Sequence, residues 1–373
     1  MPETINIVQY NILCGKLATQ DFYDECKPAD LEPNTRLARI TSKLAEFIVN
    51  RAIICLQEVP QTWLGPLHDF FSESGYTLIT SLYGHAANDY MGIAIAYPMD
   101  RFKSEKTSVI HVGNTIPLSK KVEYSFVQMF VNYFVKMLIL LICALTYPLG
   151  SLFEKNKKWF DEYGKPEFDE WVYANKRPNT MILTTLIDCK SVGRVVIVTY
   201  HMPCAFWAPK VITLHTVEMM KIAQKYSAAD PLIIAADCNF NPQSYQYRIL
   251  TSGHIKGGNE YPDVSKLDHQ NWDCQIAPMK SAYKTVNGKE PAATNQTKTG
   301  RSKKLFRATL DFIWYSGPCE PISVLPIPDL PPNVILPNEE EPSDHVLLQA
   351  QFTLGNTSDR PQCNSSVLNL NLG

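Results

Sequence analysis

Six short polar segments carry side chains whose types suit the hydrolysis of a phosphoester. They are centred on Asn11, Glu58, His201, Asp237 with Asn239, Asp311, and Asp344 with His345. Such hydrolysis needs oxygen ligands for a hard divalent cation, a group that orients and deprotonates water, and donors that offset the charge gained by the phosphate in the transition state. The carboxylates, amides and imidazoles of these segments supply all three kinds of group.

The spacing inside two of the segments favours a shared site. Asp237 and Asn239 are two residues apart on a short loop after an apolar run, so both can face one cavity, where Asp237 meets a water and Asn239 a phosphate oxygen. The alternative for this pair is an Asx turn that only satisfies backbone amides. Asp344 and His345 are adjacent and point in different directions, which lets Asp344 ligate a metal while His345 contacts the reacting phosphate.

Asp311 lies in a run of bulky strand residues at 309–315. A buried carboxylate needs a partner, and the imidazole of His345 suits it, because the pair would fix the tautomer of the ring and raise its basicity. The alternative is that Asp311 is a structural hydrogen-bond acceptor. His201 is singled out because it ends a strand-like run, as other polar segments do. The histidines expected to be structural are His68, His85, His111, His215, His254 and His269.

The elements that must position these groups follow from the apolar patterns. Strands are expected at 5–11, 52–56, 77–82, 91–97, 181–187, 194–200, 231–236, 309–315 and 345–353, and helices at 36–50, 61–73 and 211–227. Four of the six polar segments follow directly on such a strand. Strand ends and their loops are where a sandwich collects its functional groups, so we expect these segments to meet.

The composition is that of an ordinary globular protein, with 45% hydrophobic and 19% charged residues. The 35 basic and 37 acidic residues give a net charge of −2, so a polyanionic substrate must be met by a local basic patch or by metal. This balance argues against a protein that coats duplex nucleic acid. Ten cysteines without a C-x-x-C pair argue against a zinc ribbon. Because several lie in apolar runs and no secretory signal is visible, a cytoplasmic location is expected.

The order of the motifs resembles the endonuclease/exonuclease/phosphatase superfamily, which has the DNase-I-like fold. The matching motifs run from Tyr10-Asn11 and Leu56-Gln57-Glu58 to Ser343-Asp344-His345, nearly the whole chain. Further segments are similar to the deadenylase–nocturnin branch, namely Lys280–Tyr283, Glu290-Pro291, Thr294-Asn295, Leu310–Ser316 and Glu341–His345. The resemblance implies an α+β fold, a four-layer α/β/β/α sandwich of two mainly antiparallel sheets flanked by helices, over residues 1–354, followed by a polar tail at 355–373.

The same resemblance implies a role for each residue. Glu58, with Asp344 and Asn11, would bind Mg²⁺, for which Mn²⁺ can substitute. The catalytic residues would be His201, Asp237, Asn239, Asp311 and His345, and the substrate-binding residues Asn11, Asn239 and His201.

The branch acts mostly on RNA 3′ ends or on phosphate groups of small nucleotides. The expected function is therefore a metal-dependent phosphoester hydrolase, either a 3′-exoribonuclease or a nucleotide phosphatase, without a leucine-rich-repeat adaptor region. Two alternatives stay open: a membrane-associated phosphodiesterase acting on a phospholipid such as sphingomyelin, and an inactive binding module.

A hydrophobic insertion is expected at about 118–175. Its almost wholly apolar run at 137–149 belongs to a stretch nearly long enough to cross a bilayer, yet a single crossing would place Glu58 and Asp237 on opposite sides. We therefore expect residues 122–152 to dock on a membrane or on a partner protein, or to fold back as a buried helix.

Two further features concern the substrate. Phe206 and Trp207 can stack on a base, although core packing is the favoured interpretation. A basic cluster suits RNA phosphates or an anionic membrane, with a solvated loop as the favoured interpretation; it comprises Lys298, Arg301, Lys303, Lys304 and Arg307.

Overall fold

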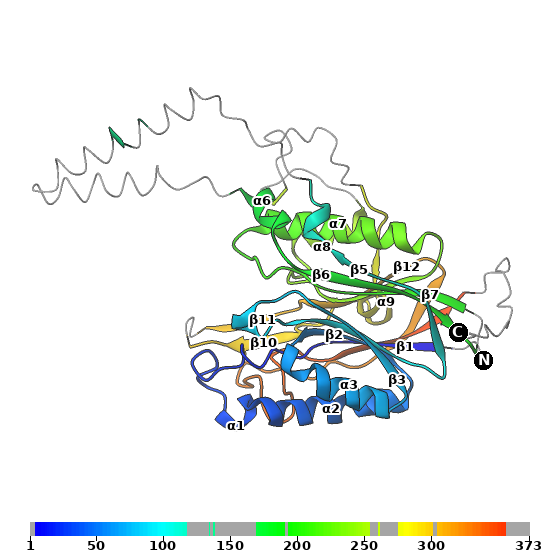
Figure 1. Ribbon diagram of the computed structural model, residues 1–373, viewed down its shortest axis with the longest axis horizontal. Coiled ribbons are helices and arrows are strands. Elements are labelled where there is room, and N and C mark those ends of the chain that lie inside the picture. The colour runs from blue at the N-terminus through cyan, green and yellow to red at the C-terminus, as the bar shows by residue number, and fades with distance from the viewer. Residues whose placement is uncertain are drawn as a thin grey trace, which may run out of the picture.

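Two six-stranded sheets pack face to face, and helices cover the outer face of each (Figure 1). The computed structural model describes residues 4–117, 134, 137–138, 169–190, 193–253, 260–261, 275–300 and 304–355. The first sheet has the strand order β13-β14-β1-β2-β4-β3. Its strands are β1 (Thr4–Asn11), β2 (Ile53–Val59), β3 (Tyr76–Leu82), β4 (Gly92–Pro98), β13 (Cys319–Val324) and β14 (Leu348–Leu354).

The second sheet has the order β5-β6-β7-β8-β12-β9. Its strands are β5 (Phe102–His111), β6 (Thr180–Asp188), β7 (Gly193–His201), β8 (Leu232–Asp237), β9 (Lys280–Ser281) and β12 (Asp311–Ser316). A separate two-stranded ribbon consists of β10 (Asn295–Lys298) and β11 (Leu305–Ala308).

Helices α2 (Pro33–Val49) and α3 (Leu64–Glu73) cover the first sheet, and α6 (Glu170–Asn175), α7 (Pro209–Ser227) and α8 (Tyr245–Ser252) cover the second (Figure 1). The shorter α1 (Pro28–Leu31) precedes α2, and α9 (Ala282–Asn287) precedes the ribbon. Helix α2 begins where the sequence provides a start: Pro33 fits the first turn, and the Glu32 carboxylate accepts a hydrogen bond from the Thr35 backbone nitrogen at 2.6 Å.

The strands alternate between two buried faces. In β8, Ile233 and Ala235 lie in the core between the sheets, whereas Ile234 and Ala236 pack against the outer helices. Successive side chains of a strand point to opposite faces, so a strand buried on both sides is an unbroken apolar run. This explains why the apolar runs predicted the central strands.

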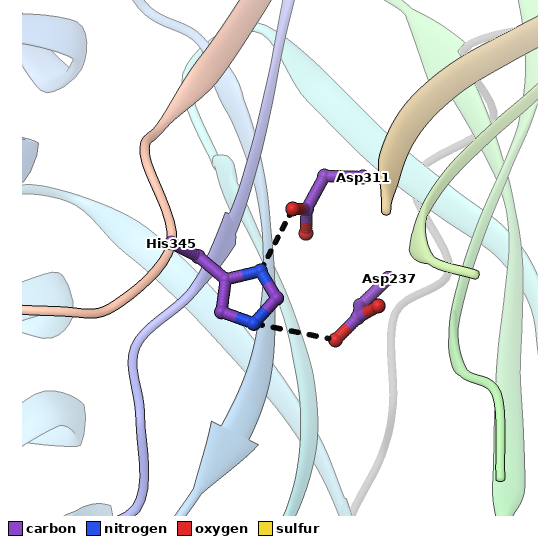
Figure 2. Close-up of side chains that lie close together, drawn as sticks. All are labelled: Asp237, Asp311 and His345. Atoms are coloured by element: carbon purple, nitrogen blue, oxygen red, sulfur yellow. Dashed lines mark hydrogen bonds and ion pairs between the residues drawn. The ribbon is translucent and has the colours of Figure 1, made fainter. Parts of the chain in front are cut away.

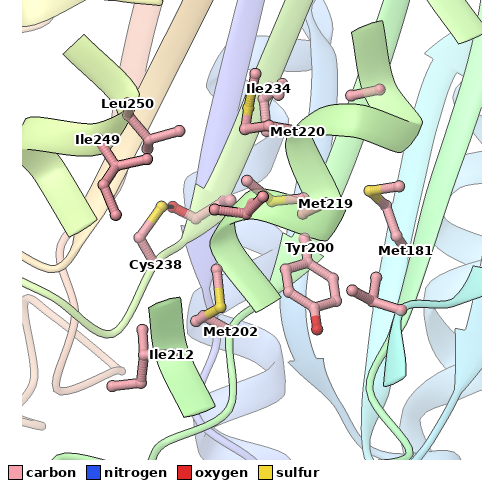
Figure 3. Packing of buried hydrophobic residues seen from close by; sticks show 14 of the residues in the cluster. Met181, Tyr200, Met202, Ile212, Met219, Met220, Ile234, Cys238, Ile249 and Leu250 are labelled. Atoms are coloured by element: carbon pink, nitrogen blue, oxygen red, sulfur yellow. Dashed lines mark hydrogen bonds between the residues drawn. The ribbon is translucent and has the colours of Figure 1, made fainter. Parts of the chain in front are cut away.

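The core between the second sheet and its helices is rich in methionine (Figure 3). Met219 and Met220 of α7 pack there with Met202 and Cys238, which directly follow the strand ends of β7 and β8. Met202 and Cys238 are both fully buried. Their burial anchors the two strand ends that carry polar residues of the candidate site.

The predicted fold class, a four-layer α/β/β/α sandwich, is confirmed. The sequence prediction omitted β5, β9, β10, β11 and β13, and it placed the last strand at 345–353. That strand begins at Leu348, because the backbone of the preceding residues bonds to the ribbon instead: the Gln296 nitrogen donates to the Asp344 oxygen at 3.0 Å and the Val346 nitrogen to the Thr294 oxygen at 2.8 Å.

Most of the predicted insertion at 118–175, including nearly all of 122–152, lies outside the described residues, as does the tail from residue 356. Its last part, α6, belongs to the core, where Trp171 and Ala174 are buried. Among the described helices, none has both the length and the apolar character that a bilayer crossing requires.

Candidate active site

Strand ends from both sheets bring the predicted polar residues to one edge of the sandwich. β1 runs parallel to β2, with Asn11 opposite Gln57, and β7 runs parallel to β8, with His201 opposite Asp237. β12 is antiparallel to β8 and begins at Asp311, which is also opposite Asp237. Parallel strands end together and an antiparallel neighbour starts at the same place, so the register alone groups these side chains.

Glu58 is turned toward the site by an irregularity in β2. Its φ is 57°, in the left-handed region, and the register with β4 shifts between Gln57 and Val59. A non-glycine residue pays on the order of 1 kcal/mol for this conformation, and such strain is concentrated at functional positions. The Glu58 carboxylate accepts hydrogen bonds from the Cys14 backbone nitrogen at 3.0 Å and from Asn11 Nδ2 at 3.1 Å.

Asn11 links carboxylates that come from opposite sheets. Besides Glu58, its Nδ2 donates to Asp237 Oδ2 at 2.9 Å, while its Oδ1 accepts from the Leu13 backbone nitrogen at 3.0 Å. The amide of Asn11 therefore holds the two carboxylates toward a common space.

Asp237 is almost completely buried, and burial raises its pKa, as does the neighbouring charge of Asp311. The nearby imidazoles act in the opposite direction. Its Oδ1 accepts from the backbone nitrogen of Asn239 at 3.0 Å, and Oδ2 lies 3.4 Å from His201 Nε2. Asn239 has a left-handed φ of 49° and donates from Nδ2 to the Met202 carbonyl at 2.8 Å, so the loop after β8 is tightly bent over the end of β7.

His345 stands between two carboxylates (Figure 2). Its Nδ1 donates to Asp311 Oδ2 at 2.7 Å, and its Nε2 lies 3.8 Å from Asp237 Oδ2. Burial alone would lower the pKa of His345, but the charges of Asp311 and Asp237 raise that pKa well above its ordinary value. Asp311 is itself held by Thr294 Oγ1 at 2.6 Å and Gln9 Nε2 at 2.8 Å. The two neighbouring carboxylates therefore favour the protonated form of His345.

The two carboxylate oxygens of Asp344 differ in their hydrogen bonding. Oδ2 accepts from the Tyr23 hydroxyl at 3.0 Å and from Asn295 Nδ2 at 3.2 Å. Oδ1 is buried and has no hydrogen-bond partner among the described residues. Burial raises the pKa of Asp344, and the charge of Glu58 raises it further.

His201 presents its Nε2 to the same space. The Tyr83 hydroxyl lies 2.6 Å from His201 Nδ1, and burial keeps the pKa of Tyr83 well above its ordinary value, so Tyr83 stays a neutral phenol. With the phenol donating to Nδ1, we assign the proton of the neutral imidazole to Nε2, which faces Asp237 at 3.4 Å and Glu58 at 4.0 Å.

A cavity of about 780 Å³ opens over these groups. Its lining includes six of the eight predicted site residues, namely Glu58, His201, Asp237, Asn239, Asp344 and His345. The other two, Asn11 and Asp311, lie behind them as hydrogen-bonded partners. The structure thus brings all eight residues together.

Aromatic side chains form part of the cavity wall. Phe22, Phe206 and Phe306 line it, and the rings of Phe206 and Phe306 lie 6.0 Å apart. Phe206 is 51% exposed and Trp207 63% exposed, so the favoured interpretation that they pack in the core is wrong. They lie on the turn after the end of β7, where the flanking Ala205 and Ala208 are buried and the two aromatic side chains stay on the surface.

A profile of the Endonuclease/Exonuclease/phosphatase family matches residues 8–345. The chain belongs to this family. The match includes every residue of the candidate site, from Asn11 to His345, and agrees with the order of motifs in the sequence. The chain is therefore a family hydrolase with the fold that the resemblance implied.

Exoribonucleases are among the curated relatives of this family member. The CCR4-Not complex 3'-5'-exoribonuclease subunit Ccr4 of Emericella nidulans is 25% identical over 95% of the chain and 52% of its own length. The chain spans about half the length of the curated relatives that it matches over most of its sequence.

Two solved structures share the fold. One is ANGEL2, described as a 2',3'-cyclic phosphatase, with a TM-score of 0.63 and 15% identity, covering 95% of this chain and 96% of that one. The other is the catalytic domain of human Nocturnin, with a TM-score of 0.57 and 19% identity, covering 95% and 94%.

The donor set fits a divalent cation, as is usual in this metal-dependent family. Asp237, Asp311 and His345 bring ligand atoms within 4.8 Å of one another. However, Asp311 already accepts three protein hydrogen bonds, one of them from Nδ1 of His345. The unpartnered Oδ1 of Asp344 points to a second position beside Glu58, which lines the same cavity. Oxygen ligands of this kind are what a hard cation takes.

Sequence reasoning missed residues that hold the site from behind. Arg36 is fully buried in α2, and its guanidinium donates to the carbonyls of Ile12, Leu13 and Pro342 at 2.6–2.7 Å. It thereby joins the loop after β1 to the loop that carries Asp344. An arginine at a buried helix position was the available signal, since a fully buried arginine requires acceptors.

Proposed function

We propose that this family member is a metal-dependent phosphoester hydrolase that acts on the 3′ end of RNA. The observation that carries the proposal is the meeting of four carboxylates, two imidazoles and two amides beside a cavity that has exposed phenylalanines in its wall. The exoribonuclease name of the relatives that match along nearly the whole chain supports the same substrate class.

In this proposal Glu58 and Asp344 hold the cation, with Asn11 beside them. The site gathers four carboxyl groups in one place, and the buried Oδ1 of Asp344 has no hydrogen-bond donor among the described residues, so it is available to a cation. When bound, a divalent cation such as Mg²⁺ offsets the negative charge of the phosphate oxygens and polarises the phosphoryl group. Mn²⁺ satisfies the same oxygen ligands.

The proton transfers fall to the chain's own residues. Asp237 accepts a proton from the attacking water, a task for which burial suits it by raising its pKa. The water oxygen bonds to phosphorus as the bond from phosphorus to the leaving sugar oxygen breaks. The leaving oxygen takes up a proton from solvent, and Asp237 returns its proton to solvent. His201 Nε2 and the imidazolium of His345 donate to the phosphate oxygens, and Asn239 positions the phosphate.

The phenylalanines of the wall would hold the terminal base. Phe206 comes from the turn after β7 and Phe306 from β11, and their ring planes meet at 52°, so a base can enter beside either ring. Base–aromatic stacking contributes about 1–3 kcal/mol per base. The substitution Phe306→Leu should therefore raise the KM for RNA with little change in kcat.

The decisive experiment offers the purified protein, with Mg²⁺, a panel of substrates: poly(A), other single-stranded RNA and DNA, NADP and sphingomyelin. Shortening of RNA from the 3′ end is expected. Release of phosphate from NADP alone would replace the proposal by a nucleotide phosphatase, and hydrolysis of sphingomyelin alone by a phospholipid phosphodiesterase.

Two variants tie the activity to the site. Glu58→Ala and Asp237→Ala are each expected to abolish turnover while the protein stays folded, and Asp69→Ala, which removes an exposed carboxylate from α3, serves as the matched control. Full activity in both site variants would refute the assigned roles.

A further inference from the structure

A second cavity, of about 720 Å³, is lined by residues that neighbour those of the catalytic cavity along the chain. The two linings adjoin on two segments. On β11, Phe306 lines the catalytic cavity and Arg307 lines the second one, as expected for consecutive residues of a strand. On the loop after β8, Asn239 lines the first and Asn241 the second. We call the second cavity the basic cavity.

Three cations give the basic cavity its charge. Lys284, Lys289 and Arg307 line it, all three are exposed, and none forms an ion pair with a described residue. Glu290 is the single acid among the described lining residues. Its carboxylate accepts hydrogen bonds from the Tyr247 hydroxyl at 2.7 Å and the Ser281 hydroxyl at 2.9 Å, and burial raises its pKa.

The positive charge of the basic cavity contrasts with the net charge of the chain and with the lining of the catalytic cavity. The chain has a net charge of −2, and the adjoining catalytic cavity is lined by carboxylates. A local group of cations beside a negative site attracts an anion that extends past the site. Asn239 and Asn241 are two residues apart, so their Cα atoms are separated by at most about 7 Å, which is comparable to one nucleotide step.

We propose that the basic cavity binds backbone phosphates of nucleotides on the 5′ side of the scissile bond. The inference rests on the proposed function, because it needs the 3′ nucleotide to occupy the catalytic cavity. Lys289 and Arg307 neutralise the phosphates, and the exposed Asn241 side chain is available to the sugar or base. The preferred substrate is then a single-stranded polynucleotide, since the dinucleotide ApA or a mononucleotide has no backbone phosphate on the 5′ side of the scissile bond.

The test is the double variant K289Q/R307Q in the full chain. Binding of a 5′-labelled oligoadenylate and of the dinucleotide ApA is measured by fluorescence anisotropy, with Ca²⁺ replacing Mg²⁺, over a range of salt concentrations. The double variant is expected to bind the oligoadenylate about tenfold to a hundredfold more weakly at low salt. Its slope of log K against log[salt] should be shallower by about 1.4, at about 0.7 per lost phosphate contact. Binding of ApA should not change.

The control variant K103Q/K190Q removes the same charge from the second sheet, at the end of its strands opposite to His201 and Asp237, where Lys103 lies on β5 and Lys190 follows β6. Equal weakening in the control would show a general charge effect and overturn the proposal. Unchanged oligoadenylate binding by K289Q/R307Q, or no oligoadenylate binding by the wild-type protein, would overturn it as well.

The two proposals can fail separately. If the wild-type protein binds oligoadenylate through Lys289 and Arg307 but does not hydrolyse RNA, the basic cavity stands and the proposed function falls. If the wild-type protein and K289Q/R307Q shorten RNA equally well at every salt concentration, the proposed function stands and the basic cavity has no part in substrate binding.

Discussion

Replacing Asp311 with asparagine separates a catalytic role of this residue from a structural one. The substitution keeps the shape of the side chain and removes its charge. Three donors, His345 Nδ1, Thr294 Oγ1 and Gln9 Nε2, contact the carboxylate at 2.6–2.8 Å. A hydrogen bond to a charged acceptor stabilises by about 1 kcal/mol more than one to a neutral acceptor, so we expect a loss of about 3 kcal/mol in the free energy of unfolding.

The effect on catalysis is expected to be larger. Without the charge of Asp311 the pKa of His345 falls, so the imidazolium is lost at lower pH and the alkaline limb of the kcat/KM profile moves to lower pH. The loss of a positioned acid should reduce kcat by about 10²–10⁴-fold at neutral pH. The measurements are urea unfolding and a pH profile of RNA hydrolysis.

Thr294→Val is the matched control. It deletes the hydroxyl that donates to Asp311 and that accepts from the backbone nitrogens of Leu310 and Asp311 at 2.9 and 3.1 Å. It should therefore cost a similar stability, about 2–3 kcal/mol, while it leaves His345 paired. If Asp311→Asn loses stability but keeps the kcat of the control, Asp311 is a structural acceptor and our reasoning is refuted.

Two more predictions concern buried residues around the site. Arg36→Met should lower the free energy of unfolding by about 3–5 kcal/mol, because it leaves carbonyls of two loops unpaired. It should also raise the metal concentration needed for half-maximal activity. An unchanged metal requirement would exclude a positioning role for Arg36. Burial lowers the pKa of His215 from 6.5 to about 4. As pH falls through this interval, the unfolded chain binds the proton before the folded protein does. The free energy of unfolding of the wild type should therefore fall by about 2 kcal/mol between pH 7 and pH 5, and that of His215→Gln should not. Parallel curves of unfolding free energy against pH for the two proteins would contradict this.

The central strands and the polar residues at their ends could be predicted from the sequence, because strands with two buried faces are unbroken apolar runs. Edge strand β5 could not be predicted in this way. It is exposed at Lys103, Glu105 and Lys106, so it lacks an apolar run, and charged residues of this kind protect an edge from further pairing.

The residues that hold the site residues in place could not be predicted from the sequence either. Tyr83, which orients His201, and Arg36, which joins two loops, act on residues more than twenty positions away. Their roles depend on tertiary contacts that no local pattern encodes. The exposure of Phe206 and Trp207 has the same origin, since whether an aromatic residue is buried is decided by neighbours distant in the sequence.

The place of β14 in the first sheet has a consequence for how the protein is made. β14 pairs antiparallel with β1 along its length, from Thr4 opposite Thr353 to Gln9 opposite Leu348. While the chain is being synthesised, β1 is present early, but one side of it stays open until β14 has been made, and Asp344 and His345 are made only shortly before β14. The first sheet and the candidate site are therefore completed at the same stage of synthesis, so an incomplete domain lacks both its closing strand and two of the site residues.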